Sequence, residues 1–264
     1  MKTRFILLNT SHAGNVGAAA RAMKVMGFDD LVLVAPRWAN VLRREETIQR
    51  ASGALDVLTQ ARIVATLDEA LDGMTHLCAT AMTPRDFGPP TQSPRAHFDA
   101  LMGLPAHPQA PPDGVAFLFG SERFGMTNED VYRCHVALQI PTNPTFGSLN
   151  LAAALQVIAY EWRMALGGFG LTHGALSPVP QPTQSAGQPA AQPAALADAQ
   201  EVSGMLRHLE EALICINFLD PASPKKLMPR LNQLFNRAAL AKEEVHILRG
   251  VAKAALEAAG RAKR

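Results

Sequence analysis

Residues 4–35, RFILLNTSHAGNVGAAARAMKVMGFDDLVLVA, place a small-residue helical pattern between two short apolar runs. The runs, RFILLN and LVLVA, are rich in leucine, isoleucine and valine without polar alternation, which is typical of strands buried on both faces. A helix that joins two such strands connects them in parallel. This stretch therefore predicts a βαβ unit and an α/β fold.

Four further apolar runs continue the pattern and predict strands. They are ARIVAT (61–66), THLCAT (75–80), VAFLFG (115–120) and VALQI (136–140). Thr66 and Thr127 are placed as helix caps between them. Apolar residues recur at helical spacing over 149–166, a pattern that leaves Glu161 and Arg163 to solvent. The sequence therefore predicts a mostly parallel sheet covered by helices.

The composition changes after this helix. Residues 167–199 contain five prolines and one charged residue, which is typical of a flexible linker. Residues 200–264 return to helical periodicity. We therefore expect an α/β domain at 1–166, a linker at 167–199 and a small helical extension at 200–264.

Charge is unevenly distributed along the chain. Residues 225–264 hold ten Lys/Arg and three Asp/Glu, a formal charge of +7, whereas fifteen against twenty leave residues 1–224 at −5. A basic extension on an acidic body favours a polyanionic partner, although a solvated helix face has the same composition.

The totals fit a cytoplasmic globular protein. The 264 residues are 48% hydrophobic and 18% charged, which excludes a wholly disordered or collagen-like chain. Cys78, Cys134 and Cys215 are widely spaced and form no zinc motif, so we expect reduced thiols and no metal. Since no apolar run is long enough for a signal peptide or a membrane span, we expect neither export nor membrane insertion.

Polar loops follow four of the predicted strands. They read NTSHAGNVGAAAR (9–21), TAMTPR (80–85), GSERFGMTNED (120–130) and PTNPTFGSLN (141–150). Because the carboxyl ends of parallel strands meet at one edge, these loops predict a single ligand site. Gly14 and Gly17 allow a ligand to approach the backbone, and the N–H groups of a helix start can hold an anion. The alternative is that Asn15 only caps the helix and Arg21 faces solvent.

Several common sites do not fit these loops. GNVG (14–17) is not the dinucleotide pattern GxGxxG, and Ala35 and Pro36 after the next strand offer no acid for a ribose. The sequence contains neither a Walker A motif nor a nucleophile elbow. His12 and His135 have no spacing that pairs them with a nucleophile, so we interpret them as structural or surface histidines.

Three ordered stretches resemble a known family. They are NTSHAGNVGAAARAMKVMGFDDLVLVAP (9–36), FLFGSERFGMTNEDVYRCHVALQIPTNPTFGSLNLAAALQVIAYEWRMA (117–165) and LNQLFNRAALAKEEVHILRG (231–250). Together they resemble the SPOUT superfamily of RNA methyltransferases and, within it, the TrmJ family, which methylates the ribose 2′-oxygen of a cytidine or uridine in the tRNA anticodon loop. The resemblance implies a homodimer, a C-terminal trefoil knot in the α/β domain, S-adenosylmethionine bound in the knot loops, and tRNA as partner.

The resemblance also implies roles for residues that match the family's motifs. The cofactor is expected against Thr80, Ala81, Met82, Gly120, Ile140, Gly147, Ser148, Leu149 and Asn150. Catalysis is expected from Arg21, Asn15 and Ser148, and substrate binding from Arg85, Glu122, Lys225, Lys226, Arg230 and Arg237. A glycine at position 120 lets the backbone approach an adenosine edge that a side chain would block. The chain departs from its relatives at Met82 and Pro84, where they are more polar and basic.

Arg21 is the residue we expect to act in catalysis. The cofactor already carries the leaving group, so the protein must align the 2′-oxygen and handle its proton. A guanidinium has a pKa above about 12, so Arg21 is expected to stabilise developing negative charge, and the proton acceptor is unassigned. Two alternatives stay open, the same chemistry on ribosomal RNA and an RNA-binding protein that has lost catalysis. The sequence does not separate a cytidine from a uridine preference.

Overall fold

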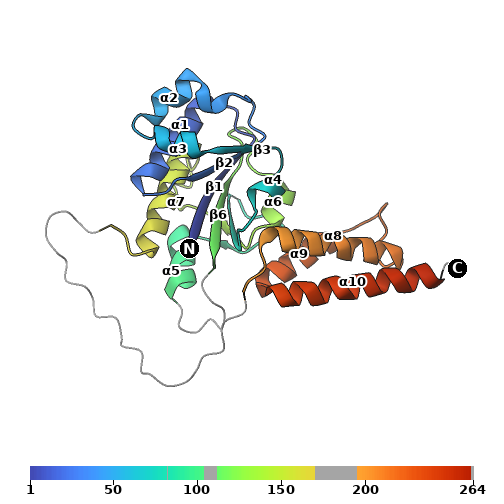
Figure 1. The fold of residues 1–264 in the computed structure, drawn as a ribbon. Helices are drawn as coiled ribbons and strands as arrows, with labels where there is room; N and C mark the ends of the chain where they lie inside the picture. Colours follow the sequence, from blue (N-terminus) through green and yellow to red (C-terminus); the bar gives the residue numbers. More distant parts are fainter. Residues whose placement is uncertain (82, 104–111, 170–194, 263–264) are drawn as a thin grey trace.

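A computed structural model gives the fold of residues 1–81, 83–103, 112–169 and 195–262. Seven strands form one sheet in the order β3-β2-β1-β6-β4-β7-β5 (Figure 1). The strands are β1 (Lys2–Leu8), β2 (Asp30–Val34), β3 (Arg62–Val64), β4 (His76–Thr80), β5 (Thr91–Gln92), β6 (Gly114–Phe119) and β7 (Val136–Leu138). Every pairing between them is parallel, which confirms the predicted mostly parallel sheet. The trefoil knot stays a prediction of the resemblance.

Side chains alternate across the sheet and fill two apolar layers. On one face, the ring of Phe117 lies 5.2 Å from that of Phe5 and 5.8 Å from that of Trp162, centroid to centroid. On the other face, Ile6 and Leu118 are fully buried in a second cluster. The central strands therefore need apolar residues wherever both faces are covered, and this explains the apolar runs 5–8 of β1 and 115–119 of β6.

Helices cover both faces of the sheet (Figure 1). They are α1 (Ala13–Val25), the 3-10 turn η1 (Val41–Arg43), α2 (Glu45–Ala51), α3 (Leu55–Gln60), α4 (Leu67–Ala70), α5 (Pro94–Gly103), α6 (Asn128–Tyr132) and α7 (Leu151–Ala165). The predicted caps are confirmed, because Thr66 accepts from the backbone N–H of Glu69 and Thr127 from that of Asp130.

Two local expectations are wrong. Arg62 and Ile63 are exposed, because β3 lies at the edge of the sheet and is not covered on both faces. Gly17 does not open the backbone to a ligand, since a Cβ atom there would lie 2.0 Å from the carbonyl oxygen of Thr47. This glycine instead lets α2 pack closely against α1.

The predicted helical extension is formed by α8 (Ala199–Cys215), α9 (Leu227–Ala238) and α10 (Lys242–Ala262). It starts before residue 200, because the backbone N–H of Ala197 donates to the carbonyl oxygen of Leu240 over 2.8 Å and Asp198 caps α8 in a capping box. Most of the predicted linker, residues 170–194, lies outside the described residues. Among the helices of the described ranges, none combines the length and the hydropathy that a bilayer crossing requires.

Candidate functional site

The predicted ligand edge of the sheet contains a cavity of about 320 Å³ at the carboxyl ends of β4, β6 and β7. Its lining comes from three loops and from α7. The lining residues include Thr80, Ala81, Thr83 and Arg85 after β4, Gly120, Ser121, Glu122, Gly125 and Met126 after β6, and Ile140, Thr142, Gly147, Ser148 and Leu149 after β7. Leu138, Leu151 and Ala154 give the cavity apolar walls.

Seven of the nine residues expected to hold a cofactor lie at this cavity. They are Thr80, Ala81, Gly120, Ile140, Gly147, Ser148 and Leu149. Met82 lies outside the described residues. Asn150 is not among the described lining residues, and its Oδ1 accepts from the backbone N–H of Ala153 over 2.8 Å, so it caps α7. The cap fixes where the helix starts, and thereby leaves Ser148 and Leu149 in the loop that faces the cavity.

Gly120 is required by its own loop. A Cβ atom at this position would lie 2.1 Å from the carbonyl carbon of Gly125 and 2.3 Å from the nitrogen of Met126. The loop closes on itself through the N–H of Ser121, which donates to the oxygen of Gly125 over 3.1 Å, and the reverse bond measures 2.9 Å. The crowding that excludes a side chain at Gly120 therefore comes already from the protein, and the approach of an adenosine edge to this backbone stays a prediction.

Glu122 joins two of the loops around the cavity. Its Oε2 accepts from the backbone N–H of Ser11 over 2.9 Å and from the Ser11 hydroxyl over 2.7 Å. Its Oε1 accepts from Nδ2 of Asn15 over 2.8 Å. Desolvation raises the pKa of Glu122, but the bonds from Asn15 and Ser11 outweigh it and hold the pKa below its ordinary value. The carboxylate is therefore ionised and locks the start of α1 to the loop after β6. Sequence reasoning missed Ser11, although it is a polar residue between a strand and a helix.

The structure separates Arg21 from this cavity. Asn15 lies within α1, which begins at Ala13, so it does not cap that helix. Arg21 is exposed on the same helix and is not among the described residues that line the cavity. Of the three residues expected to act in catalysis, Ser148 lines the cavity, Asn15 reaches it through Glu122, and Arg21 lies outside it.

Arg85 is part of the cavity wall, and part of its hydrogen-bonding capacity is unused. Its Nη2 donates to the carbonyl oxygen of Met126 over 3.4 Å. Its Nε is buried and has no hydrogen-bond partner among the described residues. An unpaired buried donor is costly, so a ligand acceptor that reaches this group would be favoured.

The basic residues of the extension lie partly beside this wall. Lys226 Nζ is 4.1 Å from the ring centroid of Phe87, and the guanidinium carbon of Arg230 is 5.2 Å from it. Arg85 and Lys226 also line one neighbouring hollow. Lys225 and Arg237, the other two expected contacts, are exposed.

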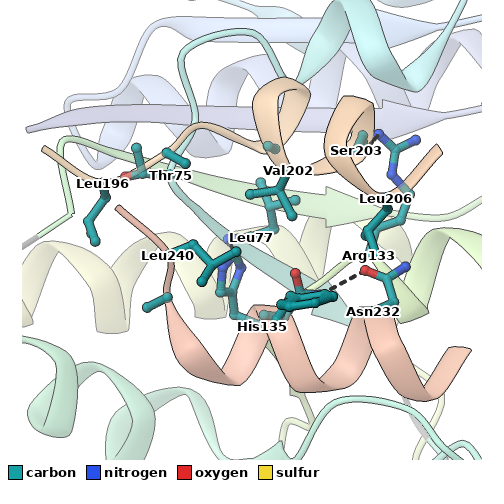
Figure 2. A pocket seen from close by; sticks show the side chains of 15 residues that line it. Thr75, Leu77, Arg133, His135, Leu196, Val202, Ser203, Leu206, Asn232 and Leu240 are labelled. Carbon is teal, nitrogen blue, oxygen red and sulfur yellow. Dashed lines mark hydrogen bonds between the residues drawn. The ribbon is translucent and has the colours of Figure 1, made fainter. Parts of the chain in front are cut away.

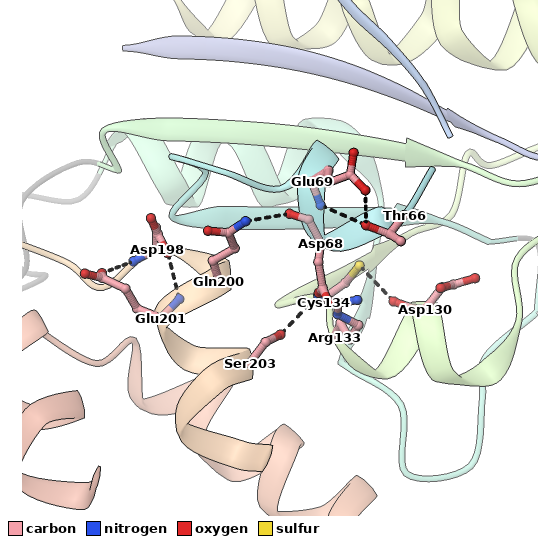
Figure 3. A network of polar contacts seen from close by, with 10 residues as sticks. All are labelled: Thr66, Asp68, Glu69, Asp130, Arg133, Cys134, Asp198, Gln200, Glu201 and Ser203. Carbon is pink, nitrogen blue, oxygen red and sulfur yellow. Dashed lines mark hydrogen bonds and ion pairs between the residues drawn. The ribbon is translucent and has the colours of Figure 1, made fainter. Parts of the chain in front are cut away.

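Polar contacts hold the extension against the α/β body (Figure 3). Nη2 of Arg133 donates to Asp68 and to the hydroxyl of Ser203. On α9, Nδ2 of Asn236 donates to the carbonyl oxygens of Tyr132 and Cys134, each over 3.2 Å. Between the two parts lies a cavity of about 20 Å³ whose walls carry side chains from both, including Leu77, His135, Leu206 and Leu240 (Figure 2). This volume holds no more than one water molecule, so the two parts are closely packed at this point, whereas a hollow of about 440 Å³ lined by Tyr132, Arg207 and Met228 lies elsewhere between them.

Three partly buried histidines form a cluster outside the lining of the 320 Å³ cavity. Nε2 of His76 is 2.9 Å from Nε2 of His97, and Nδ1 of His135 accepts from the N–H of Leu77 over 3.0 Å. Burial lowers the pKa of His97 and that of His135 to about 4, and it also holds the pKa of His76 well below its ordinary value. His135 is thus a partly buried histidine held by a backbone hydrogen bond. His76, His97 and Cys78 bring possible metal ligands within 4.8 Å of one another, so the expectation of no metal stays a prediction.

Comparison with known proteins gives two family matches. The model of the SpoU rRNA Methylase family matches residues 2–160, and that of the tRNA methyltransferase TrmJ C-terminal domain matches residues 200–264. A tRNA (cytidine/uridine/adenosine-2′-O-)-methyltransferase TrmJ of Pseudomonas aeruginosa is 42% identical, over 95% of this chain and 92% of its own length. A tRNA (cytidine/uridine-2′-O-)-methyltransferase TrmJ of Cronobacter sakazakii is 39% identical, over 94% and 93%.

Solved structures of similar proteins cover the same length. The crystal structure of TrmJ from Z. mobilis ZM4 superposes with a TM-score of 0.74 at 30% identity, over 96% of this chain and 99% of that one. A probable methylase family protein from Haemophilus influenzae Rd KW20, also 30% identical, superposes with a TM-score of 0.54 over 97% and 96%. The likeness therefore includes the body and the extension.

Proposed function

The chain belongs to the SpoU methylase family and, within it, to the TrmJ proteins, and from this premise we propose that it methylates the ribose 2′-hydroxyl of a cytidine or uridine in the anticodon loop of tRNA, with S-adenosylmethionine as donor. The observation that carries the proposal is the meeting of three strand-end loops at one cavity, which contains seven of the residues expected to bind the cofactor. The proposed location is the cytoplasm, which would keep the three free cysteines reduced.

The cavity residues fit the proposed cofactor. Leu138, Leu151 and Ala154 offer an apolar wall for an adenine ring, while Thr80 and Ser148 place hydroxyl groups at the same cavity. When bound, S-adenosylmethionine supplies the methyl group and its leaving group. The chain's own residues then have to hold the ribose in line. Glu122 serves this purpose indirectly, by fixing Asn15 and Ser11 at the mouth.

Arg21 and the homodimer belong together in this proposal. Arg21 is exposed outside its own chain's cavity, so its proposed role in stabilising negative charge requires a second copy of the chain. Val25 on α1 and Tyr160 and Met164 on α7 are 57%, 46% and 51% exposed and provide apolar surface for the pairing. Arg21→Ala is expected to abolish transfer with unchanged cofactor affinity, whereas Arg50→Ala, which removes an exposed arginine of α2, should have little effect.

Mixed dimers test the shared site. Inactive Arg21→Ala chains are mixed with inactive Gly147→Trp chains, whose cofactor cavity is blocked. Partial recovery of activity is expected, because each mixed dimer retains one intact cavity with one intact arginine. No recovery, in a mixture shown to exchange subunits, would contradict a site shared between two chains.

The extension is proposed to bind the tRNA backbone. Lys225, Lys226, Arg230 and Arg237 would neutralise phosphates, so binding should weaken as salt rises. The match of residues 200–264 to the TrmJ C-terminal domain favours tRNA over ribosomal RNA. The division into a methyltransferase domain, a linker and this extension is part of the same proposal.

Labelled S-adenosylmethionine tests the function directly. Purified protein is incubated with bulk tRNA or with ribosomal RNA, and the digested nucleosides are identified by mass spectrometry. We expect 2′-O-methylcytidine or 2′-O-methyluridine from tRNA. Label on a base, label only on ribosomal RNA, or none at all would reject the proposal, and the last result would favour an RNA-binding protein without catalysis.

A further inference from the structure

Two phenylalanines project from the loops around the cavity. Phe124 is 83% exposed and Phe146 is 81% exposed, the highest values among the large apolar side chains of the described residues. Single exposed apolar residues are common on protein surfaces. Two exposed rings on two loops of the same site need a further explanation, because neither ring contributes substantial buried area to the fold.

Both loops are held in shape by their own hydrogen bonds. The Phe124 loop is closed by the paired backbone bonds between Ser121 and Gly125, and the N–H of Phe124 donates to the Ser121 hydroxyl over 3.3 Å. In the second loop, the N–H of Phe146 donates to the carbonyl oxygen of Asn143 over 3.1 Å. The rings are therefore presented to solvent by closed turns, and their exposure does not result from a loosely packed segment.

The ends of both loops line the cavity. Ser121 and Gly125, which flank Phe124, are lining residues, and so are Gly147 and Ser148, which follow Phe146. The loops that carry the two rings thus border the cavity, where the sugar and base of a substrate would enter.

Phe124 has an arginine beside its ring, and another loop at the same edge of the sheet carries two more arginines. The guanidinium carbon of Arg123 lies 5.6 Å from the ring centroid of Phe124. On the loop after β2, Trp38 lies between Arg37 and Arg44, whose guanidinium carbons are 4.9 and 4.5 Å from its ring centroid. This loop is tied to the same edge of the sheet, since the N–H of Arg37 donates to the carbonyl oxygen of Thr10 over 3.0 Å. Aromatic rings combined with arginines are the surface that binds unpaired nucleotides.

We propose that Phe124 and Phe146 stack on unpaired nucleobases next to the target ribose and thereby select a single-stranded loop as substrate. Aromatic side chains stack on any exposed base, whereas a base within a duplex has both of its faces covered. The two rings would thus reject a stem and accept a loop without reading its sequence. The inference rests on the proposed RNA methylation, and its test measures binding separately from turnover.

The test uses the full-length dimer and an anticodon stem-loop RNA with 2-aminopurine beside the target nucleotide. Phe124→Ala and Phe146→Ala should each weaken RNA binding roughly 5- to 100-fold, the range expected for one lost stacking contact. Phe→Tyr at either position should bind within about twofold of wild type, because stacking is retained. Phe→Leu should behave like alanine, because it keeps an apolar side chain without an aromatic face. Leu55→Ala, at a 47% exposed apolar side chain of α3, is the control and should bind like wild type.

Other readouts separate stacking from a structural role. The affinity for S-adenosylmethionine and the dimer mass from light scattering should be unchanged in all variants, and the fluorescence response of 2-aminopurine should be lost only in the alanine and leucine variants. Wild-type RNA affinity in both alanine variants would overturn the inference. Dissociation of the dimer in these variants would also overturn it, since the rings would then contact a second copy.

The failure of the proposed function gives a different result. If wild-type protein binds the stem-loop but methylates no RNA, the binding series still decides the role of the rings. If wild-type protein methylates tRNA and the alanine variants bind normally, the stacking inference alone is wrong.

Discussion

Replacement of Glu122 tests the carboxylate that joins the two loops. Glu122→Ala removes the acceptor for three hydrogen bonds, two from Ser11 and one from Asn15. A bond to a charged acceptor contributes about 1.5–3 kcal/mol when buried. Glu122 is only partly buried, and water can replace some of these bonds, so we take about 1 kcal/mol for each and expect a loss of about 3 kcal/mol. In a chain of this size that corresponds to a melting temperature lower by about 6–12 °C.

Glu122→Gln separates the charge from the contacts. The Gln amide can keep the geometry if the Asn15 amide rotates, so only the charge-dependent part is lost, about 1 kcal/mol. The pKa of Glu122 is lowered in the folded protein. The unfolded chain therefore binds the proton more readily, and the carboxylate stabilises the fold above its ordinary pKa of 4.5 and loses this effect as the pH falls through the folded pKa. The gap between wild type and Glu122→Gln should thus be present at pH 7 and close at low pH.

Differential scanning calorimetry from pH 7 to pH 3.5, together with methyl transfer at pH 7, measures both effects. Glu129→Gln, which removes an exposed carboxylate from the first turn of α6, is the control and should melt near wild type. Transfer should fall more in the alanine than in the glutamine variant, since alanine releases both loops. An alanine variant that melts like wild type, or a glutamine gap that does not depend on pH, would refute this reasoning.

Three further predictions concern packing outside the cavity. In the unfolded chain His97 and His135 bind protons below about pH 6.5, whereas in the folded protein their pKa values are about 4. The free energy of unfolding should therefore fall by about 2 kcal/mol for each histidine between pH 7 and pH 5, as measured by urea unfolding. Equal stability at both pH values would contradict the burial argument. Asn236→Ala leaves two carbonyl oxygens without their donor and should lower the free energy of unfolding by about 1–3 kcal/mol, with faster hydrogen exchange in α9. Unchanged exchange would show that this contact does not hold the extension. Gly17→Ala places a methyl group 2.0 Å from the carbonyl oxygen of Thr47. It should lower the melting temperature by several degrees, since overpacking costs about 1–3 kcal/mol. An unchanged melting temperature would mean that α2 moves away freely.

The elements that the sequence predicted are those with strong local signals. The strands at the centre of the sheet have continuous apolar runs, and Thr66 and Thr127 mark helix starts with their own side chains. The short helices α2, α3 and α5 and the two-residue strand β5 escaped prediction, because their sequences are mixed and their stability comes from tertiary packing. The missed α5 explains a further error. Glu161 is not free in solvent but pairs with Arg95 of α5 over 2.7 Å. Arg163, which was also expected in solvent, donates to the carbonyl oxygen of Met26 at the end of α1.

For the site, the sequence indicated the edge of the sheet but not the contacts. The rule that ligands bind beyond the carboxyl ends of parallel strands was enough to group loops that are far apart in the chain. The choice of partners was not accessible, because Glu122 bonds to residues 107 and 111 positions away. The exclusion of a side chain at Gly17 and Gly120 also depends on neighbours that only the fold supplies.

The segment at residues 85–88 connects the cavity with the basic extension. Arg85 lines the cavity, and two residues later the ring of Phe87 lies beneath Lys226 and Arg230. Nε2 of Gln233 on α9 donates to the carbonyl oxygen of Gly88 over 2.9 Å. The extension therefore fixes the loop that carries the unpaired Nε of Arg85. A buried donor without a partner costs about 1–3 kcal/mol, and this cost favours a movement of the loop that exposes Arg85 to water. The contacts of Gly88 and Phe87 with the extension oppose that movement. The same helix that carries the cationic groups proposed to bind a phosphate backbone thus keeps Arg85 at the proposed cofactor cavity, and this is a physical reason for the contact between the two parts.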